Sequence, residues 1–96
     1  MATKMICILS YDITNNKRRR KIVKELEGVA RRVQYSVFES WLTEGQLSKV
    51  IKKTERHMEI SDGDSLLIYR LCRACSGYRE RLGGEVIDWE ESIIID

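Results

Sequence analysis

The apolar run MICIL at residues 5–9, which continues through Ser10 and Tyr11 to Asp12, constrains the fold of this chain more than any other stretch. The turn-forming sequence TNN at residues 14–16 then ends the pattern. A short apolar run closed by turn-forming residues is typical of a β-strand covered on both faces. The run therefore predicts a strand that presents the Asp12 carboxylate at its carboxyl end. Six Lys or Arg residues follow within the next twelve positions, and an acid beside a basic surface suggests chemistry on phosphate groups.

A helix is predicted over residues 17–27, after a capping residue within 14–16. Gly28 should end it, because glycine best tolerates the left-handed conformation that follows many helices. Arg19 projects from the middle of the apolar face of this helix, so its charged end must snorkel or reach a partner near the strand end. The other basic residues of the segment are predicted to point to solvent: Arg18, Arg20 and Lys21.

A second helix has the clearest periodicity in the chain. Thr43 and Gln46 form a capping-box pattern at its start. One stripe of the helix, opposite its charged face, is formed by Leu47, Val50, Ile51, Thr54 and Met58. His57 lies beside this stripe and is predicted to be a surface residue.

Further strands are predicted at residues 32–34, 37–42 and 65–71, where β-branched and aromatic residues are frequent. The join at Tyr35 and Ser36 predicts either a tight hairpin or a bulge. A polar loop is predicted over residues 73–84, and short final strand pieces at 85–89 and 93–95. The resulting order is β-α-β-β-α-β with an additional C-terminal strand, which is a ferredoxin-like α+β fold.

The 96 residues are expected to form one such domain, with a core over about residues 5–72 and an acidic β tail over about residues 85–96. The ferredoxin-like fold places both helices on one face of its sheet. The first and fourth strands are nevertheless apolar on both faces, and an uncovered apolar sheet face is sticky. A second identical sheet would cover it most economically, so we predict a homodimer. The isoleucines at 93–95 could also pair with a sheet edge of either protomer.

Composition places the chain among globular proteins, since 43% of its residues are hydrophobic and 33% are charged. No apolar run approaches the roughly 20 residues of a membrane span, and no signal-peptide pattern precedes the first strand, so a cytoplasmic location is expected. Three cysteines argue against a disulfide framework. The lone C-x-x-C of Cys72 and Cys75 lacks the second pair that a zinc site needs, and ordinary reduced thiols are favoured over a metal or redox role.

Charge is distributed unevenly along the chain. Residues 1–42 hold nine basic and four acidic residues, and residues 43–96 hold eight and eleven. The last twelve residues contain five acids and no base. A basic half beside an acidic half suggests a polyanion on one surface and a basic partner on another.

Four segments of the chain together resemble the CRISPR-associated protein 2 family, the small subunit of the spacer-acquisition machinery of bacteria and archaea. They are SYDI at 10–13, KRRRKI at 17–22, RVQYSVFE at 32–39 and DSLLIYRL at 64–71. Their order and spacing agree with the family over roughly residues 5–72. Beyond Cys72 the chain is similar to the family only in having a short acidic, β-forming tail.

This resemblance implies a ferredoxin-like homodimer in which the two Asp12 side chains face each other across the two-fold axis. Members of the family have been described as Mg²⁺-dependent nucleases that act on RNA or double-stranded DNA. They also hold DNA in a complex with the larger CRISPR-associated protein 1 integrase. By position, the candidate site residues are Tyr11, Asp12, Arg19, Arg32, Ser36 and Phe38, and Lys21 takes a place that is often basic.

Asp12 is the expected metal ligand. A single carboxylate is a poor Mg²⁺ site, but a two-fold axis supplies a second one without further sequence. An aspartate at a strand end can also serve only as an Asx-turn or a helix cap. Many relatives carry acids where this chain has Asn15 and Asn16, so a catalytic metal here would depend on Asp12 from both protomers.

The other candidates carry roles that complement the metal. Arg19 and Arg32 could clamp a phosphate. Phe38 could stack on a base or belong to the core. Ser36 and Tyr11 could hydrogen-bond a phosphate or position water, although Ser36 could instead serve the hairpin and Tyr11 could simply pack.

The first hypothesis is therefore a homodimeric Mg²⁺-dependent endonuclease of CRISPR adaptation. The alternative is a non-catalytic scaffold whose acidic tail docks the integrase and whose basic residues hold duplex DNA: Arg18, Arg20, Lys21, Arg31 and Arg32. A small-molecule regulator is disfavoured because no glycine-rich ligand loop is present. Phosphate contacts do not distinguish RNA from DNA, so both substrates stay open.

Overall fold

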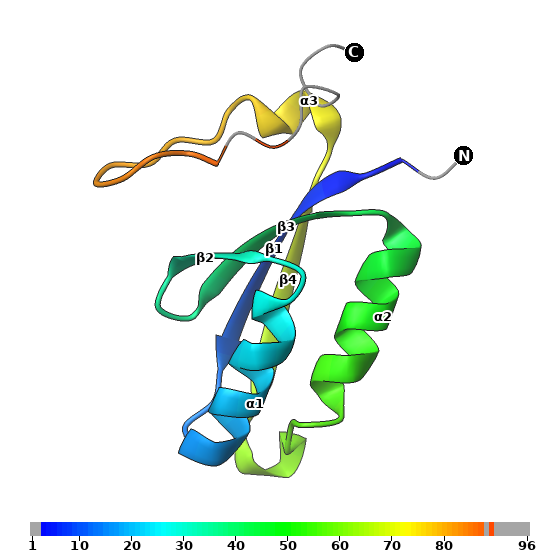
Figure 1. Ribbon diagram of the computed structural model, residues 1–96, viewed down its shortest axis with the longest axis vertical. Helices are drawn as coiled ribbons and strands as arrows, with labels where there is room; N and C mark the ends of the chain where they lie inside the picture. The colour runs from blue at the N-terminus through cyan, green and yellow to red at the C-terminus, as the bar shows by residue number, and fades with distance from the viewer. Residues whose placement is uncertain (1–2, 88, 90–96) are drawn as a thin grey trace.

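A computed structural model describes residues 3–87 and residue 89, and it shows a four-stranded antiparallel sheet with two long helices on one face (Figure 1). The elements follow in the order β1 (Met5–Asp12), α1 (Asn16–Glu27), β2 (Arg31–Gln34), β3 (Val37–Leu42), α2 (Glu44–Glu55), a 3-10 turn (Ile60–Asp62), β4 (Ser65–Leu71) and α3 (Arg73–Ser76). The sheet order is β2-β3-β1-β4. The predicted ferredoxin-like α+β fold is confirmed.

The central strand β1 pairs on both sides and divides its residues between two faces of the sheet. Cys7, Leu9 and Tyr11 point toward the helices and are buried. They pack against Phe38 of β3 and against the apolar side of the helices, where Ile22 and other residues are fully buried. The remaining alternate positions of β1 lie on the opposite, open face, because successive strand residues point to opposite sides.

Helix α1 begins at Asn16, where Asn15 is the N-cap and its side chain accepts the backbone N–H of Arg18 at 2.9 Å. The prediction for its end was wrong in one respect. Gly28 has φ −72°, which is right-handed, and Val29 closes the end by donating its N–H to the carbonyl of Leu26 at 3.1 Å. A tight turn of this kind needs no left-handed residue.

Helix α2 has the predicted capping box, with Thr43 and Gln46 bonded reciprocally at 3.1 and 2.9 Å. The predicted stripe faces the core, since Leu47, Val50 and Thr54 are buried. The hydroxyl of Thr54 donates to the carbonyl of Val50 at 2.8 Å, which satisfies a polar group at a buried position.

The join between β2 and β3 contains both of the predicted alternatives. Tyr35 and Ser36 form a two-residue turn, and the pairing register shifts by one residue at Val33. The extra residue is a β-bulge.

The chain after β4 differs from the prediction of a loop, because residues 73–76 form the short helix α3. Residues 85–87 are not in a strand. The predicted strand at 93–95 lies outside the described residues. Arg79 and Trp89 fold back to Glu39 of β3, where an Arg79 nitrogen lies 2.6 Å from a carboxylate oxygen and the indole N–H of Trp89 donates to the same oxygen. Among the described residues no helix has the length and apolar character needed to cross a membrane.

Candidate active site

Asp12 is the last residue of β1 and lies at the end of the sheet away from α3 (Figure 1). Its side chain is exposed and makes no hydrogen bond or ion pair with the residues that the structure describes. Asn15, rather than Asp12, caps α1. The helix-cap and Asx-turn roles are therefore not filled by Asp12, and its carboxylate is available to a ligand.

The open face of the sheet carries polar residues next to Asp12 and apolar residues further along β1 and β4. The cross-strand pairs on this face are Asp12 with Ser65, Ser10 with Leu67, and Ile8 with Tyr69. Leu67 is 52% exposed and Tyr69 is 57% exposed, although each lies within the fourth strand of a sheet. The Asp12 carboxylate thus stands beside half-exposed apolar side chains, whereas Arg79 and Trp89 cover Glu39 elsewhere on the same face.

Tyr11 points to the other side of the sheet and is buried. Its hydroxyl donates to the carbonyl of Tyr35 at 3.2 Å and accepts a hydrogen bond from Arg32 Nη2 at 3.2 Å. Its ring packs against Phe38 with 6.4 Å between the ring centroids. Tyr11 therefore ties the hairpin between β2 and β3 to the central strand.

Arg32 covers this aromatic cluster from the edge of the sheet. Its Nε donates to the carbonyl of Tyr35 at 3.0 Å, and its guanidinium carbon lies 5.4 Å from the Phe38 ring centroid and 5.5 Å from that of Tyr35. Phe38 itself is fully buried, so in this conformation it belongs to the core and offers no free face to a base. Arg32 remains exposed and can still meet a phosphate from outside.

The six candidate residues therefore do not form one cluster. Asp12 lies on the open face, whereas Tyr11, Arg32 and Phe38 lie on the helix side, because neighbouring residues of a strand point in opposite directions. Ser36 lies in the turn, where its carbonyl accepts the backbone N–H of Tyr11 at 3.0 Å. The two-residue period of β1 could have revealed this division from the sequence.

Arg19 reaches a partner near the strand end, as the sequence predicts. Its Nη1 donates to the carbonyls of Ile13 at 3.1 Å and Thr14 at 3.4 Å, and its Nη2 contacts the side-chain oxygen of Asn16. These bonds hold the loop that follows Asp12. Arg19 therefore positions the backbone directly after Asp12.

The prediction that Arg18 points freely to solvent was wrong. Its Nε and Nη2 donate to the two carboxylate oxygens of Asp64 at 2.8 and 3.2 Å, and its Nη2 lies 3.3 Å from an oxygen of Asp62. Asp64 is buried and also accepts the backbone N–H of Glu59 at 2.8 Å. The hydrogen bond from Arg18 holds the pKa of Asp64 below its ordinary value. This bidentate pair joins α1 to the start of β4 and is structural.

Replacing Asp64 with asparagine should lower the melting temperature at neutral pH by an amount on the order of 10 °C, because the buried negative charge and one of the two acceptor oxygens that bind Arg18 are lost. A depressed carboxyl pKa stabilises the fold above the ordinary pKa, and this contribution disappears as the pH falls through the folded pKa. The difference between wild type and Asp64→Asn should therefore shrink below about pH 4 in thermal melts. Asp62→Asn, at an exposed partner of Arg18, is the matched control and should change little. If the difference in melting temperature between wild type and Asp64→Asn grew toward acid pH, a depressed pKa of Asp64 would be contradicted.

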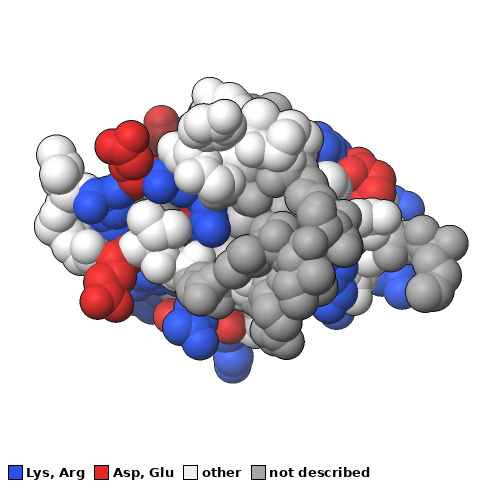
Figure 2. Space-filling model, turned by 90° about the horizontal axis from the view of Figure 1, so that it is seen from above, with Lys and Arg blue, Asp and Glu red and all other residues white. Residues whose placement is uncertain are grey.

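Three of the predicted nucleic-acid contacts remain exposed and without a described partner: Arg20, Lys21 and Arg31. Arg31 lies opposite Glu39 in the register of β2 and β3, on the open face. The end of the molecule that carries α3 shows basic and acidic side chains intermixed (Figure 2). The described residues visible at that end therefore do not form a uniformly basic surface.

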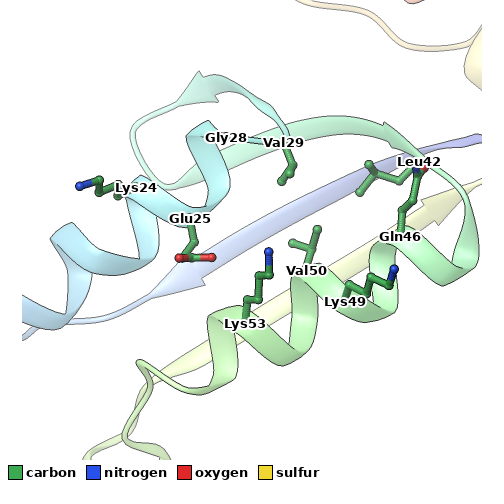
Figure 3. Close-up of a pocket in the computed structure, with 9 residues that line it drawn as sticks. All are labelled: Lys24, Glu25, Gly28, Val29, Leu42, Gln46, Lys49, Val50 and Lys53. Atoms are coloured by element: carbon green, nitrogen blue, oxygen red, sulfur yellow. The ribbon is translucent and has the colours of Figure 1, made fainter.

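The sequence analysis missed a groove of about 520 Å³ between α1 and α2. Its floor is apolar, and Lys24, Lys49 and Lys53 lie along it together with Glu25. Glu25 and Lys53 point toward each other across the groove (Figure 3), so part of its positive charge faces an acid. The four-residue spacing of Lys49 and Lys53 places both on one side of α2 and could have indicated a basic edge.

No group of three or more His, Cys, Asp or Glu side chains that could hold a metal ion is found within residues 3–87 and 89. Asp12 offers one carboxylate with free oxygens, the ligand type that Mg²⁺ prefers. A carboxylate is a suitable ligand for a divalent cation, but one carboxylate is a poor site by itself. A second protomer would supply a second carboxylate through its own Asp12.

The fold and the site define a class of protein: a small ferredoxin-like domain whose open sheet face is apolar and carries one exposed strand-end carboxylate. The sequence model of the family described as CRISPR associated protein Cas2 matches residues 5–79. The chain belongs to this family.

Individual relatives support the assignment. The CRISPR-associated endoribonuclease Cas2 1 of Chloroflexus aurantiacus is 42% identical over 82% of this chain and 85% of that protein. The CRISPR-associated endoribonuclease Cas2 of Mycobacterium tuberculosis is 41% identical over 71% of this chain, which spans 58% of the length of that relative. The crystal structure of Streptococcus pyogenes Cas2 has a TM-score of 0.71 and 26% identity, and the match covers 82% of this chain and all of that one.

Proposed function

We propose that this chain is a Mg²⁺-dependent endoribonuclease of CRISPR adaptation that acts as a homodimer, with Asp12 of both protomers in one site. The observation that carries the proposal is the exposed carboxylate of Asp12, which has no partner among the described residues and lies on the same sheet face as the half-exposed Leu67 and Tyr69. Relatives that are 41–42% identical are named endoribonucleases, which supports RNA as the first substrate to test.

The dimer is argued from the open face. Leu67 and Tyr69 expose about half of their surface there, and burying such side chains contributes roughly 1 kcal/mol or more for each. A two-fold axis through this face would apply the same gain to both protomers and would bring each Asp12 toward its counterpart. One arrangement then covers the apolar face and completes the pair of carboxylates.

A Mg²⁺ ion bound between two Asp12 carboxylates would lower the pKa of water and offset the charge that develops on a phosphodiester. The protein residues then have distinct tasks. Arg19 keeps the loop after Asp12 in place through the carbonyls of Ile13 and Thr14. Arg20 and Lys21 are exposed on α1 and can bind flanking phosphates.

A non-catalytic scaffold is the second candidate, and one observation favours it. On the helix side of the sheet, Arg32 contacts both the Tyr11 hydroxyl and the Phe38 ring, and the two rings pack together. These three residues therefore contact one another and not Asp12. In this function the dimer holds duplex DNA for the CRISPR-associated protein 1 integrase, and the acidic tail docks that partner. The exposed basic residues, Arg20, Lys21, Arg31 and Arg32, would supply the DNA contacts.

A subunit-mixing experiment tests the shared site. Wild type and Asp12→Asn are unfolded, mixed in known ratios, refolded and assayed on labelled RNA and duplex DNA with Mg²⁺ or with EDTA. If one site requires both Asp12 residues, activity falls with the square of the wild-type fraction. A linear dependence would show that each protomer acts alone. If wild type cleaves neither substrate but retains the duplex, the protein is the scaffold.

The proposed interface has its own test. Tyr69→Glu places a charge on the open face without disturbing the core, so sedimentation should shift from twice the chain mass of 11.2 kDa to that mass. Ile60→Glu is the matched control, because Ile60 is 63% exposed but lies outside the sheet. A dimer that survives Tyr69→Glu unchanged would place the interface elsewhere.

A further inference from the structure

Cys72 and Cys75 form the chemically distinctive pair of side chains outside the Asp12 site. Cys72 directly follows β4 and caps α3, and the backbone N–H of Cys75 donates to its carbonyl at 3.0 Å. The two sulfur atoms lie 3.0 Å apart, and both residues are exposed. Cys7, by contrast, is fully buried.

We propose that Cys72 and Cys75 form a thiol–disulfide exchange site, at which a low-molecular-weight disulfide oxidises the pair to a reversible intrachain disulfide. A disulfide has a sulfur–sulfur distance of about 2.05 Å, so the two sulfurs need to approach by only about 1 Å. The single turn between them already holds both on the same side of the chain.

The two sulfurs have different tasks in this exchange. The hydrogen bond between the two thiols lowers the pKa of Cys72 and raises the pKa of Cys75. The Cys72 thiolate attacks one sulfur of the small disulfide, and the other sulfur leaves as a thiolate and takes a proton. Cys75 then loses its proton and attacks the sulfur of Cys72, which releases the second small thiol. Two cysteine thiols are oxidised and one small disulfide is reduced to two thiols.

A zinc site is a poorer fit for the same pair. Structural zinc takes four ligands, and the described residues include no group of three or more suitable side chains. The pair also lies at the opposite end of the sheet from Asp12 (Figure 1), so exchange there does not use the proposed nuclease site.

The position of the pair gives the disulfide a structural consequence. Cys72 is the first residue after the sheet, and the segment that starts there returns to the open face, where Arg79 pairs with the buried carboxylate of Glu39 at 2.6 Å. A disulfide between residues 72 and 75 closes a loop of four residues at the base of this segment, which includes Arg73 but not Arg79. Oxidation should therefore slow trypsin cleavage after Arg73 and leave cleavage after Arg79 unchanged.

The test uses full-length protein in glutathione buffers that range from reducing to oxidising, followed by acid quenching, alkylation under denaturing conditions and intact-mass analysis. Oxidised wild type should lose two hydrogens and retain one alkylatable thiol, and Cys7→Ser should show the same loss. Cys75→Ser should instead accumulate a mixed disulfide with glutathione on Cys72. In reduced wild type, native alkylation at neutral pH should label Cys72 faster than Cys75.

Several results would overturn the proposal. They are three free thiols in wild type in the most oxidising buffer, a disulfide that requires Cys7, covalent dimers on non-reducing gels, and stoichiometric zinc that protects both thiols. Circular dichroism of Cys72→Ser and Cys75→Ser excludes unfolding as the cause of a lost reaction, since both positions are exposed.

Discussion

Asp12→Asn is expected to reduce Mg²⁺-dependent RNA cleavage at least about 100-fold while leaving the fold and the dimer intact. The substitution keeps the shape of the side chain but removes the negative charge that Asp12 of each protomer brings to the proposed metal site. Because Asp12 is exposed and has no partner among the described residues, its loss should cost little stability. The effect should therefore appear in the rate of cleavage and not in the melting temperature.

The measurement compares initial rates on labelled RNA with Mg²⁺ and with EDTA, and thermal melts of the same samples. Glu27→Gln is the matched control, since Glu27 is also exposed and acidic but lies at the far end of α1. Cleavage by Asp12→Asn at the wild-type rate would remove Asp12 from the site. Equal loss in Glu27→Gln would indicate a general effect of charge on RNA binding.

The second large effect is expected at Phe38, where substitution by alanine should lower the free energy of unfolding by about 3–5 kcal/mol. Phe38 is fully buried between Tyr11 and Arg32, so its removal leaves a cavity and takes away the surface over which the guanidinium of Arg32 lies. Urea denaturation of the purified variant measures the change. Phe38→Leu is the control that keeps an apolar side chain, and it should cost roughly 1–2 kcal/mol.

This substitution also separates the two interpretations of Phe38. If Phe38 is a core residue, the free energy of unfolding falls in Phe38→Leu and falls further in Phe38→Ala. The RNA affinity of the folded fraction then stays near that of wild type. A base-stacking residue would show the reverse, with intact stability and an affinity that falls by about 1–3 kcal/mol. Unchanged stability in Phe38→Ala would contradict the burial described above.

Local patterns determined the elements of this fold. The apolar run ending at Asp12, the capping box of Thr43 with Gln46, and the helical stripe that includes Leu47 each predicted an element that the structure contains. These predictions succeed because the periods of strands and helices depend on neighbouring residues. The sequence of β4 also predicted an apolar open face, because Leu66 and Ile68 face the helices while Leu67 and Tyr69 face the other side of the sheet.

Tertiary structure alone decided which charged side chains are free. Arg18 and Arg20 are identical residues only two positions apart, yet Arg18 is bound to Asp64, which lies 46 positions away in the sequence, whereas Arg20 is exposed. Cys72 and Cys75, by contrast, are brought together by local structure, since the single turn of α3 holds their sulfurs 3.0 Å apart, although residues 73–84 were predicted to be a loop. Pairing over a long sequence separation depends on how the elements pack, and no local period encodes it.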